Sequence, residues 1–316
     1  MLEIVRPGIQ TTVQDLGRHG YRHLGVAQCG AMDGPAMWLA NRLVNNPANL
    51  AGLEMVAGPI EIRFLRAAWF ALTGADFAAT QDGKAVDSGW RNRSAVGQVL
   101  KLRGAKTGMR AYLAVDGGIA VPEILGGRAT DIQAKFGGFE GRALAAGDQL
   151  PLGSTHHLER RIGGWQPEWL PEVRVLPGPE FEQFSPDVRA SFFNHAWTVS
   201  AQSNRMASRL EGSVLARDPG DKGGELLSHG VLPGVVQVPP NGQPIVLLAD
   251  SQTTGGYPRI AVVIDADLWK FAQAPAGKKI HFVATDLDGA RAARAQWQQT
   301  HYRFEQSAYG NIGKPA

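Results

Sequence analysis

The chain has 316 residues, a formal net charge of +3 and one cysteine, Cys29. This length is enough for two domains or one large β-rich domain, and a single cysteine excludes an intramolecular disulfide and suits a reducing compartment. Its basic residues are scattered, and no uninterrupted apolar run has membrane-spanning length, so we expect a cytoplasmic protein that binds neither nucleic acid nor a membrane. The 39 Gly and 19 Pro favour short strands over long helices.

The N-terminal segment predicts a strand at residues 2–5, followed by a polar loop with regularly spaced glycines at residues 11–20. Asp15 lies in this loop and is a candidate for contact with a substrate. Asp33, which follows Gly30-Ala31-Met32, has two interpretations. It is a substrate contact or, as we favour, the N-cap of a helix with Pro35 in its first turn.

The segment after this helix alternates apolar runs with turns. We predict strands at residues 54–56, 60–64, 69–73, 77–80, 99–102 and 111–115. Asp82-Gly83 is a hairpin signal. Gly97, Gly147 and Gly277 are each followed by apolar residues three and five positions later, which predicts a turn that leads into a half-buried strand. Because this pattern occurs in both halves, it favours two related β-barrel or sandwich units.

The composition places a domain boundary in the middle of the chain. Residues 154–171 are rich in Arg, Gly and Pro and are predicted to link an N-terminal unit, residues 1–153, to a C-terminal unit, residues 172–316. The pair His156-His157 lies in this segment, but no further ligand stands at a metal-binding spacing, so we expect no metal.

The second half contains two candidate segments before its longest polar loop. In Ser203-Asn204-Arg205-Met206, Asn204 can donate and accept hydrogen bonds, and Arg205 offers a planar fork for a carboxylate or phosphate. The alternative is that this arginine is a surface charge. His229, in a glycine-flanked turn, is a candidate acid–base residue, with a structural hydrogen bond as the alternative.

The polar loop lies between two predicted strands, residues 245–249 and 260–264, and Gln237 precedes it. Its side chains are a carboxylate, an amide, two hydroxyls and a phenol: Asp250, Gln252, Thr253, Thr254 and Tyr257. This mixture predicts a substrate-binding loop, whereas the structural alternative is a Gly-Gly turn with local hydrogen bonds. Helices are predicted near residues 265–271, with Asp265 or Asp267 as the cap, and near residues 286–302.

Several motifs are missing from the sequence. There is no Gly-x-x-x-x-Gly-Lys-Ser/Thr, no Gly-x-Gly-x-x-Gly, no Gly-x-Ser-x-Gly and no Cys-x-x-Cys. The sequence also has no Met-Lys-Met of the kind that carries covalent biotin, so biotin would have to arrive on another chain. These observations favour a subunit that works with other chains.

Four segments resemble a known family: residues 11–20 (TTVQDLGRHG), 30–33 (GAMD), 203–206 (SNRM) and 237–264. In them the chain is similar to the allophanate hydrolase subunit 2 family, also called the KipI-antagonist-like or biotin-dependent carboxyltransferase family. Within it, the similarity is greatest to the branch that provides the C subunit of bacterial 5-oxoprolinase. The resemblance implies a mainly β fold with tandem cyclophilin-like barrels, a few helices and a C-terminal helix. One departure is Ala207, where relatives commonly have Gly.

The resemblance also implies an activity. With 5-oxoprolinase subunits A and B as partners, such a chain takes part in the ATP-dependent opening of the 5-oxoproline (pyroglutamate) ring to L-glutamate. We expect Asp250, His229 and Tyr257 to be catalytic. We expect the following residues to bind the lactam substrate: Asn204, Arg205, Gln237, Gln252, Thr253, Thr254, Asp15 and Asp33. Which subunit binds ATP, and whether the chain forms a homo-oligomer, stay open.

Two other functions stay open at this stage. The first is transfer of a carboxyl group to a urea-like amide, with biotin supplied by another chain. The second is a non-catalytic role, as the antagonist of a kinase-inhibitor protein.

Overall fold

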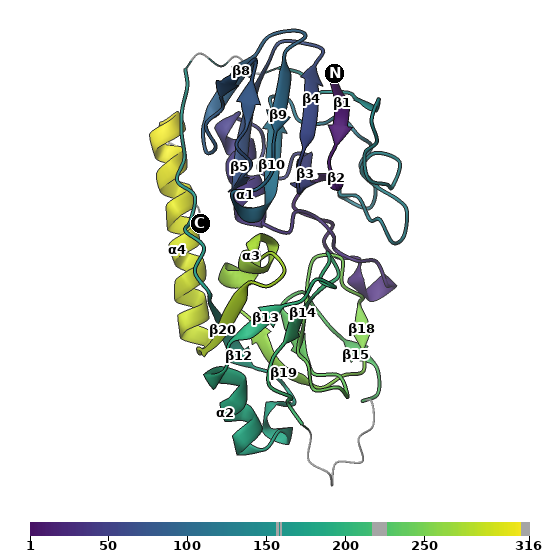
Figure 1. Cartoon of the computed structure of the whole chain (residues 1–316), viewed down its shortest axis with the longest axis vertical. Helices are drawn as coiled ribbons and strands as arrows, with labels where there is room; N and C mark the ends of the chain where they lie inside the picture. Colours follow the sequence, from purple (N-terminus) through teal and green to yellow (C-terminus); the bar gives the residue numbers. More distant parts are fainter. Residues whose placement is uncertain (156–157, 159, 217–225, 311–316) are drawn as a thin grey trace. The chain divides into compact units, whose positions relative to one another are not determined.

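The computed structural model describes residues 1–155, 158, 160–216 and 226–310 and divides the chain into two compact units (Figure 1). Unit 1 contains Met1–Tyr21 and Gln28–Glu168, and unit 2 contains Arg22–Ala27 and Trp169–Ala316. The predicted linker, residues 154–171, spans the division after Glu168, and its histidine pair lies outside the described residues. That this segment acts as a linker stays a prediction.

Unit 1 is built from two antiparallel sheets. The first sheet has the strand order β11 (Gln149–Leu150), β1 (Leu2–Pro7), β4 (Ile60–Phe64), β9 (Val99–Leu102), β6 (Thr80–Gln81) and β7 (Lys84–Ala85). The second has the order β2 (Gln10–Gln14), β3 (Gly52–Val56), β10 (Thr107–Val115), β5 (Ala68–Asp76) and β8 (Arg91–Ser94). Asp82 and Gly83 join β6 to β7 with positive φ angles of 49° and 78°, as the predicted hairpin requires.

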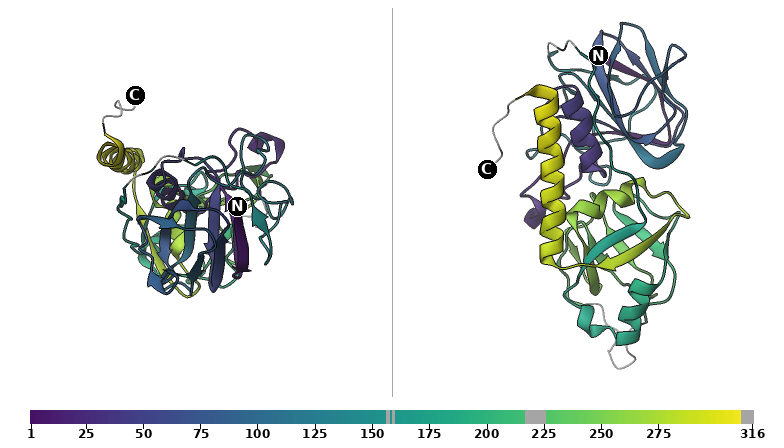
Figure 2. Two further views of the ribbon diagram at one scale, coloured as in Figure 1. Left: turned by 90° about the horizontal axis from the view of Figure 1, so that it is seen from above. Right: turned by 90° about the vertical axis from the view of Figure 1, so that its left-hand side faces the viewer.

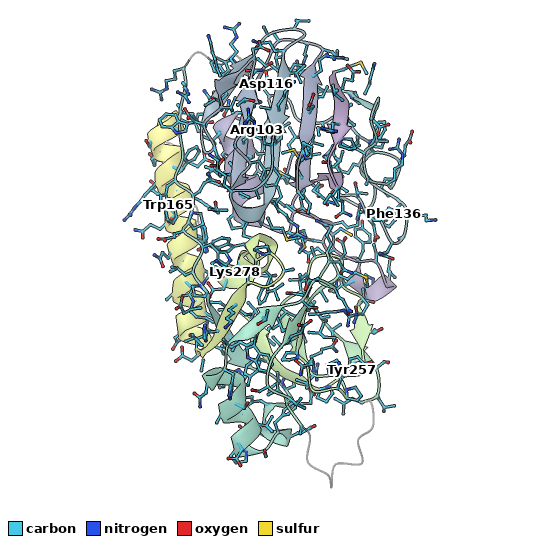
Figure 3. All side chains as sticks on the ribbon, in the orientation of Figure 1. Arg103, Asp116, Phe136, Trp165, Tyr257 and Lys278 are labelled. Carbon is cyan, nitrogen blue, oxygen red and sulfur yellow. The ribbon has the colours of Figure 1, made fainter. Side chains whose placement is uncertain are left out.

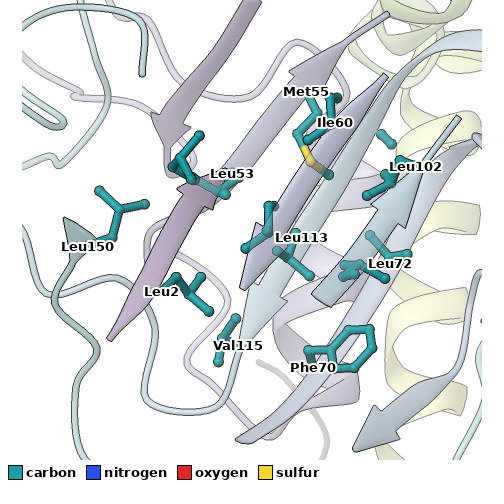
Figure 4. Close-up of a cluster of buried hydrophobic side chains, with 14 of the residues drawn as sticks. Leu2, Leu53, Met55, Ile60, Phe70, Leu72, Leu102, Leu113, Val115 and Leu150 are labelled. Carbon is teal, nitrogen blue, oxygen red and sulfur yellow. The ribbon is translucent and has the colours of Figure 1, made fainter. Parts of the chain in front are cut away.

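The core of unit 1 is formed by alternate residues of both sheets. In β4, for example, Ile60, Ile62 and Phe64 are fully buried while the residues between them are half-buried, which is the period of two expected for a strand with one covered face. Figure 4 shows side chains from both sheets in this core, including Leu2 from β1 and Leu113 from β10. Burial of this apolar surface is the main force that holds the two sheets together.

One helix completes unit 1. Helix α1 (Gly34–Leu43) begins after Asp33, whose side chain accepts a hydrogen bond from the Ala36 N–H, and a proline stands in its first turn. This confirms that Asp33 is an N-cap. The helix packs against β5 and β10 through the buried face that carries Met37 and Leu43 (Figure 2).

Unit 2 is a closed barrel with a predominantly antiparallel sheet. Its strand order is β12 (Glu172–Pro177), β19 (Arg259–Val263), β16 (Val235–Gln237), β17 (Ile245–Leu247), β14 (Ala207–Glu211), β13 (Trp197–Val199) and β20 (Lys279–Ala284). Strands β20 and β12 pair in parallel and close the barrel. The mainly β class with a barrel is therefore confirmed.

Short helices and one long helix accompany the barrel. They are η1 (Arg22–Leu24), η2 (Phe181–Gln183), α2 (Pro186–Asn194), α3 (Asp265–Gln273) and α4 (Leu287–Tyr309). The long helix α4 begins at the Asp286 N-cap and packs on α3, where the Trp297 indole N–H donates to the Ala266 carbonyl. The predicted C-terminal helix is confirmed and extends beyond residue 302. No helix in the described ranges is both long and apolar enough to cross a membrane.

Two local predictions need correction, and one helix was not predicted. Residues 77–79 form no strand because Ala78 has a φ of 48° and the Phe77 carbonyl accepts hydrogen bonds from residues 103 and 104, so the chain turns there. Helix α2, capped by Ser185, was not predicted. In addition, neither Asp265 nor Asp267 caps α3, because the N-cap position is Ile264 and the Asp267 carboxylate binds Arg174 on β12.

Candidate functional site

The polar loop of unit 2 forms a small second sheet beside the barrel. Strand β15 (His229–Gly230) pairs with β18 (Thr254–Gly255), and His229 lies opposite Gly255 in this pairing. The segment between the two long predicted strands is therefore partly a strand. This pairing brings His229 and the predicted loop together, although more than 20 residues separate them in the sequence.

The His229 ring is held at one nitrogen only. Its Nδ1 lies 3.1 Å from the Leu227 carbonyl oxygen. Its Nε2 is buried and, among the described residues, has no hydrogen-bond partner. If Nδ1 carries the proton and donates to that carbonyl, Nε2 is a free acceptor, which is the arrangement a general base needs.

Gln237 lies against the same strand. It is 2% exposed, and its Nε2 donates to the Tyr257 carbonyl at 3.4 Å. A Cβ at position 255 would lie only 2.8 Å from this Nε2, so Gly255 is required for the close approach. The predicted residues His229 and Gln237 are therefore brought to either side of one glycine.

An ion pair that the sequence did not reveal lies next to this group. The Arg259 guanidinium donates to both Glu180 carboxylate oxygens, at 2.6 and 2.7 Å, and Arg259 is paired with Gln237 in the barrel register. The hydrogen bonds from Arg259 lower the pKa of Glu180 below its ordinary value, and His229 adds a smaller electrostatic effect in the same direction. Glu180 is therefore ionised at neutral pH and lies within the electrostatic range of the imidazole. The only hint in the sequence was that each residue follows a proline.

Asp250 and Arg205 bind each other. Arg205 donates from Nε and Nη2 to the two carboxylate oxygens, each at 2.8 Å, and both side chains are about 5% exposed or less. Each was expected to contact a substrate. The geometry gives the pair a structural function, because it fixes the start of the loop, and their catalytic and binding roles stay predictions.

The other predicted residues of unit 2 are held by local bonds or lie on the surface. Asn204 Oδ1 accepts hydrogen bonds from the N–H groups of residues 206 and 207. The Gln252 and Thr253 carbonyls accept from Arg22 and from the Val231 N–H, while Thr254 is exposed. Tyr257 is half-buried (Figure 3). Their roles in binding or catalysis stay predictions.

The two predicted residues of unit 1 are buried and hydrogen-bonded to backbone groups. Asp15 accepts from the N–H groups of Gly17 and Arg128, and Asp33 caps α1. Next to Asp33, the Tyr112 hydroxyl donates to Glu54 at 2.8 Å and accepts from the Asp33 N–H at 2.8 Å. Burial raises the pKa of Tyr112 well above its usual range, with a further contribution from Glu54. Asp15 and Asp33 therefore stabilise the backbone of unit 1 through these hydrogen bonds.

Neither unit provides an obvious metal centre. Within the described ranges, no group of three or more His, Cys, Asp or Glu side chains is arranged to hold a metal ion. The chemical resources of the site are an imidazole, a buried amide and an adjacent ion pair. Such a set suits a small neutral polar group such as an amide, because the amide offers one acceptor and, unless fully substituted, at least one donor.

Comparison with known proteins identifies the chain's relatives. Residues 24–284 match the family described as "Carboxyltransferase domain, subdomain A and B". The chain is 50% identical to the C subunit of 5-oxoprolinase from Escherichia coli, over 98% of both chains. It is 41% identical to the C subunit of 5-oxoprolinase from Haemophilus influenzae, over 93% of this chain and 94% of that one.

A solved structure is similar over nearly the whole chain. The urea amidolyase of K. lactis superimposes with a TM-score of 0.88 at 28% identity, over 99% of this chain. The match covers only 20% of that much longer protein. Both units described above therefore have counterparts in one segment of a larger enzyme.

Proposed function

Since the chain belongs to the carboxyltransferase domain, subdomain A and B family, we propose that it is the C subunit of an ATP-dependent 5-oxoprolinase. In this proposal it acts with subunits A and B to hydrolyse 5-oxo-L-proline to L-glutamate. The observation that carries the proposal is the near-full-length similarity to the C subunits of two bacterial 5-oxoprolinases. A similarity that covers nearly the full length of both aligned proteins is a stronger argument for a shared role than a similarity to one fifth of a longer enzyme.

The lactam is proposed to bind at the sheet formed by β15 and β18. Gln237 is placed to recognise the amide, and His229 Nε2 is placed to accept a proton. An amide is stabilised by resonance, so its C–N bond breaks readily only after the carbonyl oxygen has been activated, most simply by phosphorylation with ATP. Water then attacks the activated carbon, and the ring nitrogen leaves with a proton, which gives an open-chain acyl phosphate. A second water cleaves this acyl phosphate to the carboxylate and inorganic phosphate.

The ATP step is assigned to a partner subunit in this proposal. The sequence has no Gly-x-x-x-x-Gly-Lys-Ser/Thr. Biotin is likewise not attached to this chain, because the sequence lacks Met-Lys-Met. The residues of unit 2 thus supply recognition and proton transfer, and the partners supply energy.

Reconstitution tests the proposed function. Purified subunits A and B and this chain are mixed with ATP and 5-oxoproline, and glutamate is measured with each subunit omitted in turn. We expect glutamate only when this chain is present. Equal glutamate formation by subunits A and B alone would show that the chain is not required and would overturn the proposal.

Carboxyl transfer is the second candidate, favoured by the family's description and by the likeness to urea amidolyase. In that reaction, the carboxyl group would leave a biotin nitrogen and form a new C–N bond with the amide nitrogen. The discriminating measurement is labelled bicarbonate in a mixture that includes a biotin carboxylase and its biotinylated carrier. Label retained in an N-carboxylated amide, without any glutamate, would favour this reaction over hydrolysis.

A further inference from the structure

Arg18 in unit 1 is the most deeply buried arginine among the described residues for which the structure shows no acidic partner. It is 1% exposed, although arginine is rarely fully buried unless it is paired. Within the described ranges, no carboxylate oxygen lies within the 4.0 Å of an ion pair. The nearby acids are otherwise engaged, because Asp15 and Asp131 accept hydrogen bonds from backbone N–H groups.

The guanidinium is enclosed by the segment from residue 124 to residue 137. Its Nη2 donates to the Ala129 carbonyl at 2.5 Å, its Nε lies 3.4 Å from the Ile124 carbonyl, and the Phe136 ring centroid is 4.5 Å from its central carbon. Its Nη1 is buried and has no hydrogen-bond partner among the described residues. Figure 3 labels Phe136, which marks the position of this segment in unit 1.

The backbone around Arg18 is shaped to leave room for it. A Cβ at Gly137 would lie 2.5 Å from Nη2, and one at Gly127 would lie 3.1 Å from the Arg18 Cβ. Gly137 also has a φ of 72°, a backbone conformation that residues with a side chain rarely adopt. Non-glycine residues in the same segment, Leu125 and Lys135, have positive φ angles as well. Such strained backbone commonly surrounds binding sites.

A second buried polar atom without a partner belongs to the same region. Gln14 is fully buried, and its Nε2 donates to the Thr130 carbonyl, which is the neighbour of the carbonyl that Arg18 binds. Its Oε1 has no hydrogen-bond partner in the part of the chain that the structure describes. The region thus has an unused N–H donor with a positive charge and an unused acceptor.

We propose that Arg18 binds the carboxylate of a small ligand, through Nη1, inside unit 1. A purely structural arginine that only bridges two carbonyls would carry a buried charge without a counter-charge, which is costly. A carboxylate supplies the counter-charge and accepts the remaining N–H. Resting on the proposed function, the ligand is a second molecule of 5-oxoproline, bound apart from the one proposed at β15 and β18, and its ring N–H also offers a donor for Gln14 Oε1.

Calorimetric titration of the full-length chain with 5-oxoproline tests this proposal. 2-Pyrrolidinone, which has the same lactam ring without the carboxylate, is the matched ligand, and L-glutamate tests whether the open-chain product shares the site. We expect saturable binding of 5-oxoproline and at least about 10-fold weaker binding of 2-pyrrolidinone, since a charge-assisted hydrogen bond is lost. Failure of the wild-type chain to bind 5-oxoproline overturns the proposal.

Arg18→Gln is expected to weaken 5-oxoproline binding by about 10- to 100-fold and to leave the weak binding of 2-pyrrolidinone unchanged. The control is Arg91→Gln, because Arg91 is also a buried arginine of unit 1 whose guanidinium donates to carbonyls. This control is expected to lower the melting temperature without changing the affinity. Equal affinities for wild type and a folded Arg18→Gln variant would overturn the proposal.

Hydrogen exchange on the wild-type chain decides the matter even if Arg18→Gln does not fold. Added 5-oxoproline should slow exchange of backbone N–H groups in residues 124–138. Protection confined to residues 250–257 would contradict a site at Arg18. The two proposals fail separately. A folded Arg18→Gln variant that binds 5-oxoproline as tightly as the wild type refutes only this site. Binding at Arg18 by a chain that the reconstituted enzyme does not need refutes only the proposed function.

Discussion

Arg18 of unit 1 differs from the buried arginines of unit 2 in what surrounds its charge. In unit 2, Asp250 is paired with Arg205 and Glu180 with Arg259, each through two hydrogen bonds between the charged groups. In unit 1, Arg18 has only carbonyl oxygens and an aromatic ring around it among the described residues. The two carboxylates near the catalytic candidate His229 are therefore each paired with an arginine, whereas unit 1 has a cation that needs an anion.

Replacement of His229 should produce the largest effect. It should lower the activity and leave the stability nearly unchanged. In reconstituted enzyme, His229→Gln is expected to lower the rate of glutamate formation by about 10²- to 10⁴-fold, the usual contribution of an acid–base group. Stability should change by less than about 1 kcal/mol, because the ring makes one bond, to Leu227. His195→Gln is the control, since His195 is on the exposed end of α2. An unchanged rate would remove His229 from the mechanism.

Breaking the buried pair of unit 2 should have the largest effect on stability. Asp250→Ala removes the carboxylate to which the buried Arg205 donates from both Nε and Nη2, so we expect a loss of about 3–5 kcal/mol in the free energy of unfolding. Asp288→Ala removes an exposed pair with Arg291 and should cost less than about 0.5 kcal/mol. Urea unfolding followed by circular dichroism measures both. Similar losses for the two variants would contradict the structural function given to the buried pair of Asp250 and Arg205.

Tyr112→Phe tests the hydrogen-bonded network of unit 1. The variant removes the hydroxyl that joins Glu54 to the Asp33 N–H, and both groups are buried, so about 1–3 kcal/mol should be lost. Tyr302→Phe on α4, which is half-buried, should change the free energy of unfolding by less than about 0.5 kcal/mol. If Tyr112→Phe leaves the free energy of unfolding unchanged, water takes the place of the hydroxyl in the variant.

A pH dependence of stability is expected from His301 on α4. Burial lowers the pKa of His301 to about 4, against a smaller opposing effect of Glu305. The folded state therefore keeps the ring neutral, while the unfolded chain takes up a proton below its ordinary value of about 6.5. Stability from this group is complete above about pH 6.5 and is lost as the pH falls towards 4.

Melting temperatures between about pH 7 and pH 4 check this prediction. His301→Gln should flatten the decline between about pH 6.5 and pH 4.5. The acidic groups Glu180 and Asp267 act in a lower window, because hydrogen-bonded arginines lower the pKa of each carboxyl, for Asp267 in spite of its burial. Their contribution is present above about pH 4.5 and is lost below it. A wild-type profile that matches the variant's would contradict the assignment to His301.

The sequence predicted correctly those strand and helix ends that are set by residues next to them in the chain. Strands β4 and β9 begin and end at the predicted residues because apolar residues alternate and turn residues precede both strands. Asp33 and Asp286 were identified as helix starts for the same reason, since a cap is bonded within three residues. The glycine pattern at residues 97, 147 and 277 precedes β9, β11 and β20 as expected.

Pairings between distant residues could not be predicted in this way. Asp250 and Arg205 were each recognised as candidates, but their separation of 45 positions gave no sign that they bind each other. Glu180 and Arg259 are 79 positions apart and were not considered together. Arg18 was noted only as part of a polar loop, because its burial depends on a segment more than 100 residues away.

The path of the chain also limits how the protein can be made and divided. Residues 22–27 belong to unit 2, and Arg22 donates to the carbonyls of Val231 and Gln252. Val231 and Gln252 come more than 200 residues later in the chain, so Arg22 can form these hydrogen bonds only after that part of the chain has been synthesised. A fragment that starts at Trp169 would lack it, so the polar loop of unit 2 would lose its anchor. Expression of either unit alone therefore needs a redesigned N-terminal segment.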